Sequence, residues 1–111
     1  MPIERGEVYW VNFDPSVGGE IRKTRPAIVL SNNAANTYLN RVQVVPITSN
    51  TERLYPGEAF VILNAEKRKA MAAQLTTASK LRLGRKIGAL SKEDLERVEA
   101  AVRVQLDLDC A

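Results

Sequence analysis

Two short segments of this sequence carry side chains that could do chemistry on a phosphate. The first holds a cluster of charges directly before a proline and after a glycine pair: Glu20, Arg22, Lys23 and Arg25. Arginine offers a planar fork of donors that matches phosphate oxygens, and it stays protonated in nearly any environment. Arg25 could therefore stabilise the charge that builds up on a pentacoordinate phosphorus. A merely solvated, mobile loop is the alternative explanation of this cluster.

The second segment runs from Pro46 to Asn50, where an apolar stretch gives way to three polar side chains, Thr48, Ser49 and Asn50. Thr48 could hold a phosphate oxygen or orient a ribose hydroxyl. Threonine and serine also commonly end a strand and cap the turn that follows it. From residue types alone, that structural role is the stronger alternative.

The sequence contains no histidine, and this excludes several classes of enzyme. Ser-His-Asp and Cys-His nucleophile systems, paired-histidine ribonucleases and the usual zinc and iron sites all require imidazole. The single cysteine, Cys110, cannot form an intrachain disulfide, and we treat it as incidental. We expect no metal and no cofactor, so a reaction here must use arginine, lysine, carboxylates, hydroxyls and backbone amides.

Positive charge is concentrated in the middle of the chain. Residues 1–50 hold five basic and four acidic side chains, residues 51–88 eight and three, and residues 89–111 three and six, which gives +1, +5 and −3. A basic segment suits a polyanion such as nucleic acid, although solvated basic faces also occur on proteins that bind none. The run Lys67-Arg68-Lys69 is interpreted as a solvated turn that adds to the positive field.

Length and composition predict one domain over residues 1–111. A chain of this length with 45% hydrophobic residues can bury one core. No apolar run approaches the roughly 18 residues that a spanning helix needs. The first residues lack the charged and then apolar regions of a signal peptide. We therefore expect a soluble, cytoplasmic protein with no membrane partner.

Short runs rich in β-branched and aromatic residues predict a mainly β (α+β) fold. Residues 14–25 read as a mobile polar loop, residues 32–40 as a connection, and Pro46 as a sign of a bulge or a sheet edge. Tyr9 and Trp10 are interpreted as packing residues. Strands are expected over residues 6–13, 26–31, 41–48 and 58–63, with weaker candidates over residues 70–78 and 85–90.

A helix is predicted from Ser91 onward. Ser91 is followed three positions later by Asp94, as at a capped helix start, and one helical face then carries Leu95, Val98, Val102 and Leu106. Several short strands with one closing helix imply a curled, mostly antiparallel sheet that resembles a small barrel, with the helix covering one opening or face.

Taken in order, these segments resemble the MazF/PemK family of toxin endoribonucleases. The resemblance spans almost the whole chain, and the ordered set of motifs is more specific than any one of them. The motifs are Arg5-Gly6-Glu7-Val8-Tyr9-Trp10, Gly18-Gly19-Glu20 leading to Thr24-Arg25-Pro26-Ala27-Ile28-Val29-Leu30-Ser31, Val45-Pro46-Ile47-Thr48-Ser49-Asn50, and the Gln74 region followed by Ile87-Gly88 and the helix.

The resemblance implies an SH3-like barrel related to the CcdB toxins, a homodimer, and metal-independent cleavage of single-stranded RNA. It implies catalytic roles for Arg25 and Thr48, with Glu20 as a further participant and the first candidate for the proton acceptor. Attack of a ribose 2′-hydroxyl on its own phosphate would leave a 2′,3′-cyclic phosphate and a 5′-hydroxyl. It also implies a cognate MazE-like antitoxin, whose acidic, disordered tail would suit the basic middle segment.

Sequence recognition must come from groups that reach the bases, since phosphate contacts position RNA without reading it. Ser49, Asn50 and Gln74 are the candidates, with Arg22 and Lys23 as further RNA-binding residues. The chain departs from the family around Gln74: it has Ala73 where an acidic residue is common and Thr76 where a basic one is common. The family's usual cut sequence therefore does not transfer to this chain.

Two functions from other classes stay open at this point. A CcdB-like protein would poison a topoisomerase through protein contacts of its terminal helix and would not need Arg25 and Thr48. A non-catalytic RNA-binding barrel would bind RNA without cutting it.

Overall fold

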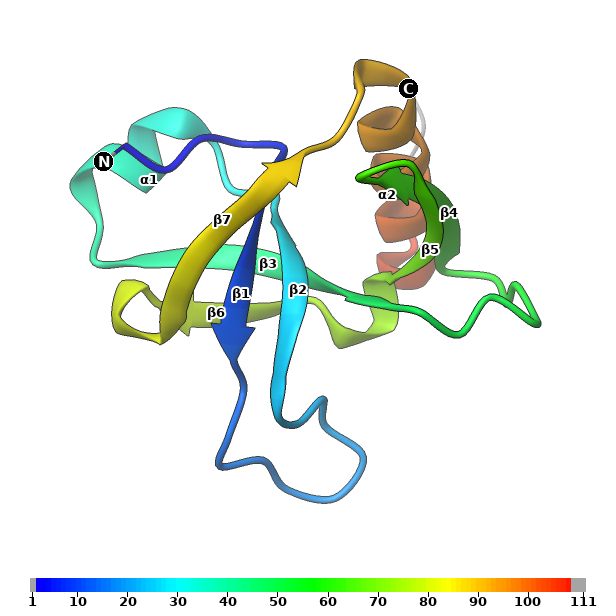
Figure 1. Ribbon diagram of the computed structural model, residues 1–111, viewed down its shortest axis with the longest axis horizontal. Coiled ribbons are helices and arrows are strands. Elements are labelled where there is room, and N and C mark those ends of the chain that lie inside the picture. The colour runs from blue at the N-terminus through cyan, green and yellow to red at the C-terminus, as the bar shows by residue number, and fades with distance from the viewer. Residues whose placement is uncertain (1, 109–111) are drawn as a thin grey trace.

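Strands dominate the computed structural model, which describes residues 2–108 (Figure 1). Cys110, which was interpreted as incidental, lies outside this range. In the order of the chain, the elements are β1 (Glu7–Asn12), β2 (Thr24–Val29), α1 (Asn33–Tyr38), β3 (Arg41–Thr48), β4 (Glu58–Leu63), β5 (Glu66–Met71), the 3₁₀ turn η1 (Ala72–Gln74), β6 (Thr76–Ser79), the 3₁₀ turn η2 (Lys80–Arg82), β7 (Leu83–Ala89) and α2 (Lys92–Leu106).

The strands form one antiparallel, curled sheet in the order β4-β5-β3-β2-β1-β7, with β6 also paired to β3. Strand β3 lies at its centre. One edge of β3 pairs with β2, and the other pairs first with β6, over residues 41–44, and then with β5, at residues 47–48. Pro46 lies between the residues of β3 that pair with β6 and those that pair with β5. Because neither strand pairs with β3 at this position, the missing N–H of proline costs no hydrogen bond to them.

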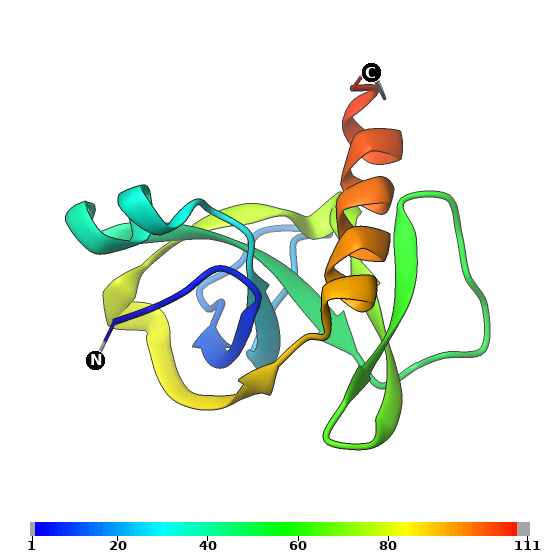
Figure 2. The same ribbon diagram turned by 90° about the horizontal axis from the view of Figure 1, so that it is seen from above.

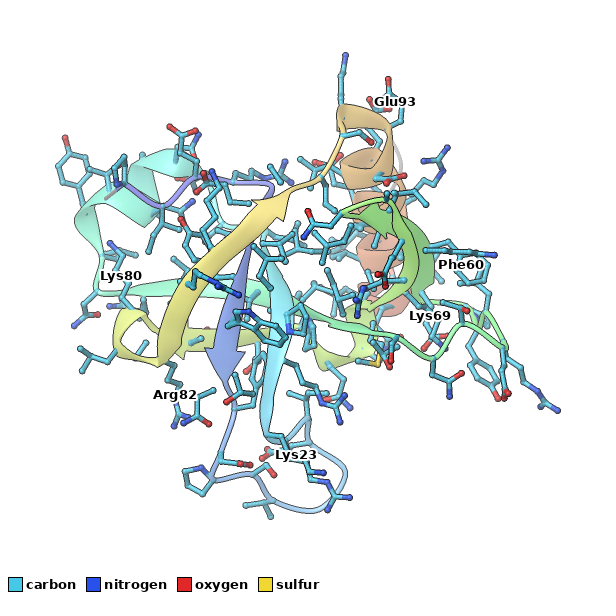
Figure 3. The ribbon with its side chains drawn as sticks, viewed as in Figure 1. Lys23, Phe60, Lys69, Lys80, Arg82 and Glu93 are labelled. Carbon is cyan, nitrogen blue, oxygen red and sulfur yellow. The ribbon has the colours of Figure 1, made fainter. Side chains whose placement is uncertain are left out.

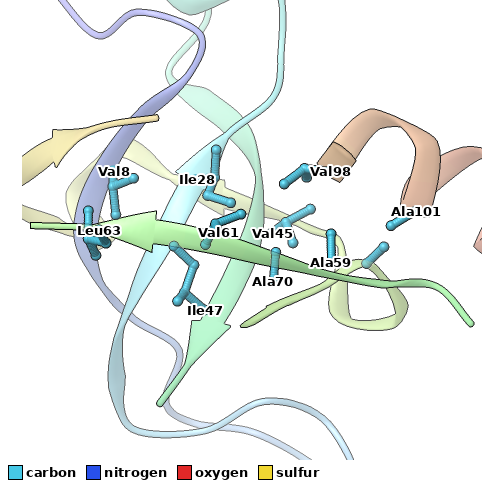
Figure 4. Packing of buried hydrophobic residues seen from close by; sticks show 11 residues of the cluster. Val8, Ile28, Val45, Ile47, Ala59, Val61, Leu63, Ala70, Val98 and Ala101 are labelled. Carbon is cyan, nitrogen blue, oxygen red and sulfur yellow. The ribbon is translucent and has the colours of Figure 1, made fainter. Parts of the chain in front are cut away.

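Two clusters of buried side chains fill the two sides of this curled sheet. Alternation along β1 divides them, because Val8 belongs to one cluster and Tyr9 and Val11 belong to the other. The first cluster joins strand residues such as Ile28 and Val45 to α2 (Figure 4). The β-branched residues that predicted strands from the sequence thus supply both cores.

Helix α2 closes the first cluster along the β4–β5 hairpin, while α1 lies at the opposite end of the molecule (Figures 1 and 2). The Ser91 hydroxyl accepts a hydrogen bond from the Asp94 N–H at 3.1 Å, as the sequence predicted for a capped start. The Asp94 carboxylate in turn accepts from the Ile62 N–H of β4 at 2.8 Å. Val98 and Ala101 are the buried helix residues that enter the core.

Three local expectations from the sequence were wrong. Residues 32–40 are more than a connection, because the Asn32 side chain accepts from the Ala35 N–H and starts the short helix α1. Lys67-Arg68-Lys69 is not a solvated turn but the middle of β5, with Lys69 only 6% exposed. The single weak strand expected over residues 70–78 is instead the end of β5, the turn η1 and the start of β6.

The expected fold class is confirmed: a mainly β, curled antiparallel sheet with a C-terminal helix. Among residues 2–108, no helix is both long enough and apolar enough to cross a membrane.

Candidate functional site

The loop between β1 and β2 extends away from the sheet and is fixed at its base (Figure 1). The Phe13 N–H donates to the Lys23 carbonyl at 2.9 Å, and the Lys23 N–H donates to an Asp14 carboxylate oxygen at 3.0 Å. Lys23 takes a positive φ of 69°, a conformation that non-glycine residues seldom adopt. Arg82 adds an outside anchor, since its Nη1 donates to the Asn12 carbonyl at 3.0 Å and also to the Asp14 carbonyl.

Figure 3 places Lys23 on this projecting loop and Arg82 near the point where the loop leaves the sheet. The role of Arg82 was not apparent from the sequence. Nothing in its local sequence marks it, because its two acceptors lie 70 and 68 positions earlier in the chain.

Gln74 fastens the other leg of the loop to η1. Its Oε1 accepts from the Ile21 N–H at 3.0 Å, and its Nε2 donates to the Gly19 carbonyl at 3.0 Å. Glu20 lies between these two bonded residues. The Glu20 side chain is exposed, and its Oε1 accepts from the Val17 N–H at 2.9 Å.

Arg25 and Thr48 lie near the ends of two neighbouring strands, β2 and β3. Ala27 of β2 pairs with Pro46 of β3, and Arg25 and Thr48 each lie two residues beyond that pair, in the same direction along the antiparallel strands. Side chains two residues apart on a strand share a face of the sheet. Arg25 and Thr48 therefore project from the same face, as the joint function expected from the sequence requires.

The Arg25 guanidinium is partly fixed and partly available. Its Nε donates to the Arg22 carbonyl at 3.0 Å, and this is the only hydrogen bond of the Arg25 side chain within residues 2–108. Both terminal nitrogens thus keep free N–H groups. These two nitrogens form the edge of the guanidinium fork that can bind a phosphate bidentately. Arg25 is half-buried, so its stem is held while its head stays accessible.

Thr48 begins a loop that its own hydroxyl helps to form. Its Oγ1 accepts from the Asn50 N–H at 3.2 Å, and the Asn50 Oδ1 accepts from the Glu52 N–H at 3.2 Å. Because Oγ1 is the acceptor, its own proton remains available to a phosphate oxygen. Ser49 and Asn50 are exposed directly beside it. The turn-capping role and a role toward a ligand are therefore compatible.

A buried lysine secures the far part of the same loop. Lys69 pairs across the β3–β5 ladder with Thr48, and its Nζ lies 3.1 Å from the Glu58 carboxylate and 2.8 Å from the Arg53 carbonyl. The Glu58 carboxylate also accepts from the Tyr55 N–H at 2.8 Å. The loop between β3 and β4 is thus fastened by an ion pair next to Thr48, and Figure 3 labels Lys69 at this position.

A polar cavity of about 350 Å³ lies between the β1–β2 loop and β6. Its walls include Phe13, Glu20 and Ile21 from the loop side, and Gln74 and Arg82 from the other. Exposed Arg22 and Lys23 make no side-chain hydrogen bond or ion pair within the described residues. The structure therefore brings Gln74 to the residues around Glu20, places Arg25 and Thr48 on the same face of adjacent strands, and leaves Arg22 and Lys23 on the loop surface.

Away from this site, a cluster of polar side chains, Glu7, Tyr9 and Lys86, links β1 to β7. Burial acts to raise the pKa of the Glu7 carboxyl, but hydrogen bonds from Lys86, the Glu4 N–H and Tyr9 outweigh it and lower the pKa. Lys86 Nζ lies 2.6 Å from Glu7. Burial and the hydrogen bond to Glu7 raise the pKa of Tyr9 to about 12. In the described range, no group of three or more histidine, cysteine, aspartate and glutamate side chains could hold a metal ion.

The sequence and the fold match one class of protein, the toxins of type II toxin-antitoxin systems. Residues 4–106 match the family model described as PemK-like, MazF-like toxin of type II toxin-antitoxin system. The chain belongs to this family, and the resemblance drawn from its sequence motifs is confirmed.

Individual relatives support the same assignment over the full length. The chain is 37% identical over 117 residues to endoribonuclease MazF9 of Mycobacterium tuberculosis, covering 96% of this chain and 98% of that one. The crystal structure of MazF from Deinococcus radiodurans superimposes with a TM-score of 0.84 at 25% identity, covering 96% and 98% of the two chains. A mycobacterial endoribonuclease in complex with its cognate antitoxin has a TM-score of 0.81 at 22% identity, covering 98% and 99%.

Proposed function

We propose that this MazF-like toxin is an endoribonuclease that cuts single-stranded RNA, messenger RNA in particular, at a short sequence and thereby inhibits translation and growth. Its full-length relative is named an endoribonuclease. The observation that carries the proposal for this chain is the shared face of Arg25 and Thr48 at the ends of β2 and β3. Arg25 offers a free guanidinium edge and Thr48 a free hydroxyl proton on this face, and the loop carries two further exposed cations.

In the proposed reaction, the ribose 2′-oxygen forms a bond to phosphorus while the bond from phosphorus to the 5′-oxygen breaks. Arg25 stabilises the negative charge on the phosphate and supplies the proton to the leaving 5′-oxygen. Glu20 accepts the proton of the 2′-hydroxyl. Thr48 orients the phosphate, because an unassisted threonine is a poor acid and a poor base. The products are a 2′,3′-cyclic phosphate and a 5′-hydroxyl, and the scheme needs no metal because Arg25 provides the positive charge.

We assign RNA binding outside the reacting atoms to two groups of residues. Arg22 and Lys23 contact phosphates, since their exposed side chains are not engaged elsewhere among residues 2–108. Ser49, Asn50 and Gln74 contact bases. The Gln74 amide has a second lone pair and a second N–H besides those used by the loop, so a base contact is compatible with its bonds to Gly19 and Ile21.

We further propose that the toxin is a cytoplasmic homodimer neutralised by a MazE-like antitoxin. The solved mycobacterial relative was captured with its cognate antitoxin. Support from this chain comes from an apolar groove of about 870 Å³ between β4 and α2, where Ile62 and Val104 are 52% and 60% exposed. Exposed apolar surface of this kind favours association with another chain. The cytoplasm is where messenger RNA is translated.

The test is cleavage of a mixed-sequence, single-stranded RNA by the purified protein in the presence of EDTA, followed by mapping of the ends. We expect discrete cuts with 2′,3′-cyclic phosphate and 5′-hydroxyl termini. Arg25→Ala and Thr48→Val should lower the rate by roughly 100-fold or more, since each removes a group that acts on the transition state.

Two matched variants control for general damage. Arg41→Ala removes an arginine from the opposite end of β3, and Thr37→Val removes a hydroxyl on α1. Both should cut at the wild-type rate. RNA left intact by the wild-type protein would refute the nuclease function, and full cleavage by folded Arg25→Ala and Thr48→Val would move the site elsewhere.

A further inference from the structure

The side chain of Gln74 holds both peptide groups that flank Glu20. The Gly19 carbonyl belongs to the peptide before Glu20, and the Ile21 N–H belongs to the peptide after it. Both hydrogen bonds are 3.0 Å long. An amide that accepts from one of these groups and donates to the other restricts the two backbone torsions between them, which are φ and ψ of Glu20.

The two partners of this contact differ in rigidity. Gln74 ends the 3₁₀ turn η1, where Ala72 is 2% exposed, the Ala72 N–H donates to the Gly57 carbonyl at 3.0 Å, and the Leu75 N–H donates to Ala72 at 3.1 Å. The loop segment has the opposite character. Gly18 and Gly19 precede Glu20, and a Cβ added at either glycine would meet nothing within 4 Å. A segment of this composition and openness has many accessible conformations.

We propose that Gln74 is a positioning residue that fixes the backbone of Glu20 and thereby sets where its carboxylate can act. The inference rests on the proposed function of Glu20 as proton acceptor. It assigns to Gln74 a contribution to the rate of cleavage that is separate from contact with bases. We call the two hydrogen bonds of Gln74, to Gly19 and Ile21, the clamp. The clamp also holds Ile21 over the second core cluster, where Ile21 packs against the buried residues.

The chemistry of the clamp requires an amide. Leucine has a similar size but neither accepts nor donates. Glutamate keeps an acceptor for the Ile21 N–H, but it has no donor and would bring a carboxylate against the Gly19 carbonyl. Gln74→Leu should therefore lose both bonds, and Gln74→Glu should keep only the one to Ile21.

Hydrogen exchange of the Ile21 amide measures the clamp without any RNA. Two ordinary hydrogen bonds raise the equilibrium constant for the closed loop conformation relative to open ones by on the order of ten- to a hundred-fold. Exchange at Ile21 should therefore accelerate by about tenfold or more in Gln74→Leu and by less in Gln74→Glu. Gln43→Leu is the matched control, since Gln43 donates to Thr77 Oγ1 at 3.1 Å and is not bonded to the loop. It should leave exchange at Ile21 unchanged.

Cleavage kinetics connect the clamp to Glu20. We expect kcat of Gln74→Leu to fall about tenfold, because the loop spends less time in the competent conformation, whereas loss of the proposed base contact acts on KM and on the cut sequence. Adding Gln74→Leu to Glu20→Ala should lower kcat no further, as expected for a residue that acts through another. Gln43→Leu should cut at the wild-type rate.

Two results would overturn the proposal: unchanged exchange at Ile21, or a full additional loss of kcat in the Glu20→Ala background. A wild-type protein that does not cut RNA would refute the proposed function instead, and the exchange measurement would still decide whether Gln74 holds the loop.

Discussion

Arg25 is the residue whose chemistry depends most on the shape of its side chain. Its Nε is held by the Arg22 carbonyl, and its two terminal nitrogens make no hydrogen bond within residues 2–108. Lysine at this position would keep the charge but would lose both the planar fork and the bond to Arg22.

We predict that Arg25→Lys lowers the cleavage rate by roughly 10- to 100-fold, because one point charge replaces two directed hydrogen bonds to the phosphate. Initial rates on a single-stranded RNA measure the effect, with Arg41→Lys as the control for the same exchange at a distant position. Wild-type activity in Arg25→Lys would mean that positive charge alone is sufficient.

Tyr9 provides a prediction about pH. Its pKa is raised from 10.0 to about 12 by burial and by its hydrogen bond to Glu7, at 2.9 Å, so the folded protein favours the protonated phenol. A group whose pKa is raised by folding contributes its full stability below the pKa of the unfolded state. This contribution is lost as the pH rises through the pKa of the folded state. The free energy of unfolding should therefore decline between pH 10 and pH 12.

Tyr9→Phe should remove the Tyr9 contribution to that decline. The ultraviolet absorbance of tyrosinate gives a direct check, because Tyr9 is 8% exposed, whereas Tyr38 and Tyr55 are 84% and 54% exposed. The variant should lose the component that titrates near pH 12. A wild-type protein that shows no tyrosine ionisation near pH 12 would contradict the buried hydrogen bond.

Residue types in the sequence pointed to Arg25, Thr48 and Glu20, but the sequence could not supply their supports. Arg82 and Gln74 contact the β1–β2 loop from positions more than fifty residues away, and a single sequence gives no information on contacts of that range. The candidate site was thus predictable as a list of polar groups and not as an arrangement.

Among the elements, β5 is the one that links stability to the site. Its Lys69 is 6% exposed, is paired with Glu58 at 3.1 Å, and lies opposite Thr48 in the ladder. A buried ion pair adds little stability compared with apolar residues, but removal of one partner leaves a buried charge without compensation.

We predict that Lys69→Met lowers the free energy of unfolding by about 3 kcal/mol, since Glu58 would lose its cation and the Arg53 carbonyl its donor. Lys69→Met combined with Glu58→Gln should recover part of the loss. Urea denaturation measures both. Lys67→Met on the same strand should cost less than about 1 kcal/mol, because Lys67 is exposed and its contact with the Phe60 ring, at 3.9 Å, is a surface cation–π interaction. Equal losses for the two lysines would argue against the buried pair.

The sequence predicted β3, β4 and α2 closely because each carries a strong local signal: β-branched runs in the two strands, and a cap with a helical apolar face in α2. It missed β5 because the strand reads Glu-Lys-Arg-Lys, which resembles a solvated turn. The sequence did contain one signal for β5, the two residues Asn64 and Ala65 that separate it from β4, a spacing that favours a hairpin. In the structure, both residues of this turn have positive φ.

For the whole molecule, the uneven charge predicts how RNA binding responds to salt. Residues 51–88 carry an excess of five positive charges, eight basic less three acidic, and the β1–β2 loop region adds Arg22, Lys23 and Arg25. Each phosphate neutralised on a single strand contributes about −0.7 to the slope of log K against log salt.

With Arg22, Lys23 and Arg25 each on a phosphate, we predict a slope of about −2, so that a fourfold rise in salt weakens binding by roughly 20-fold. Fluorescence anisotropy on a single-stranded RNA with methylated 2′-hydroxyls measures binding without cleavage. The double variant Arg22→Gln, Lys23→Gln should reduce the slope to about −0.7. An unchanged slope would exclude these two side chains from phosphate contact.

The fold class was predictable from the sequence, since several short strands and a closing helix leave few ways to bury one core. The change of partner along one edge of β3 was not. It depends on which strands meet across long stretches of chain, such as Val44 with Thr76 and Ile47 with Ala70, and Pro46 alone indicated only that something interrupts the ladder there.

The pairing of β1 with β7 has a consequence for the making of the protein. Glu7 lies opposite Ala89, and Arg5 is bonded to Glu99 at 2.6 Å, so the first strand finds its outer partner only among the last elements of the chain. On the ribosome, β1 therefore keeps an open edge until β7 has been synthesised and has emerged. A nascent chain that lacks β7 leaves that edge of β1 unpaired, and it follows that the sheet of the toxin is completed only after β7 has been made.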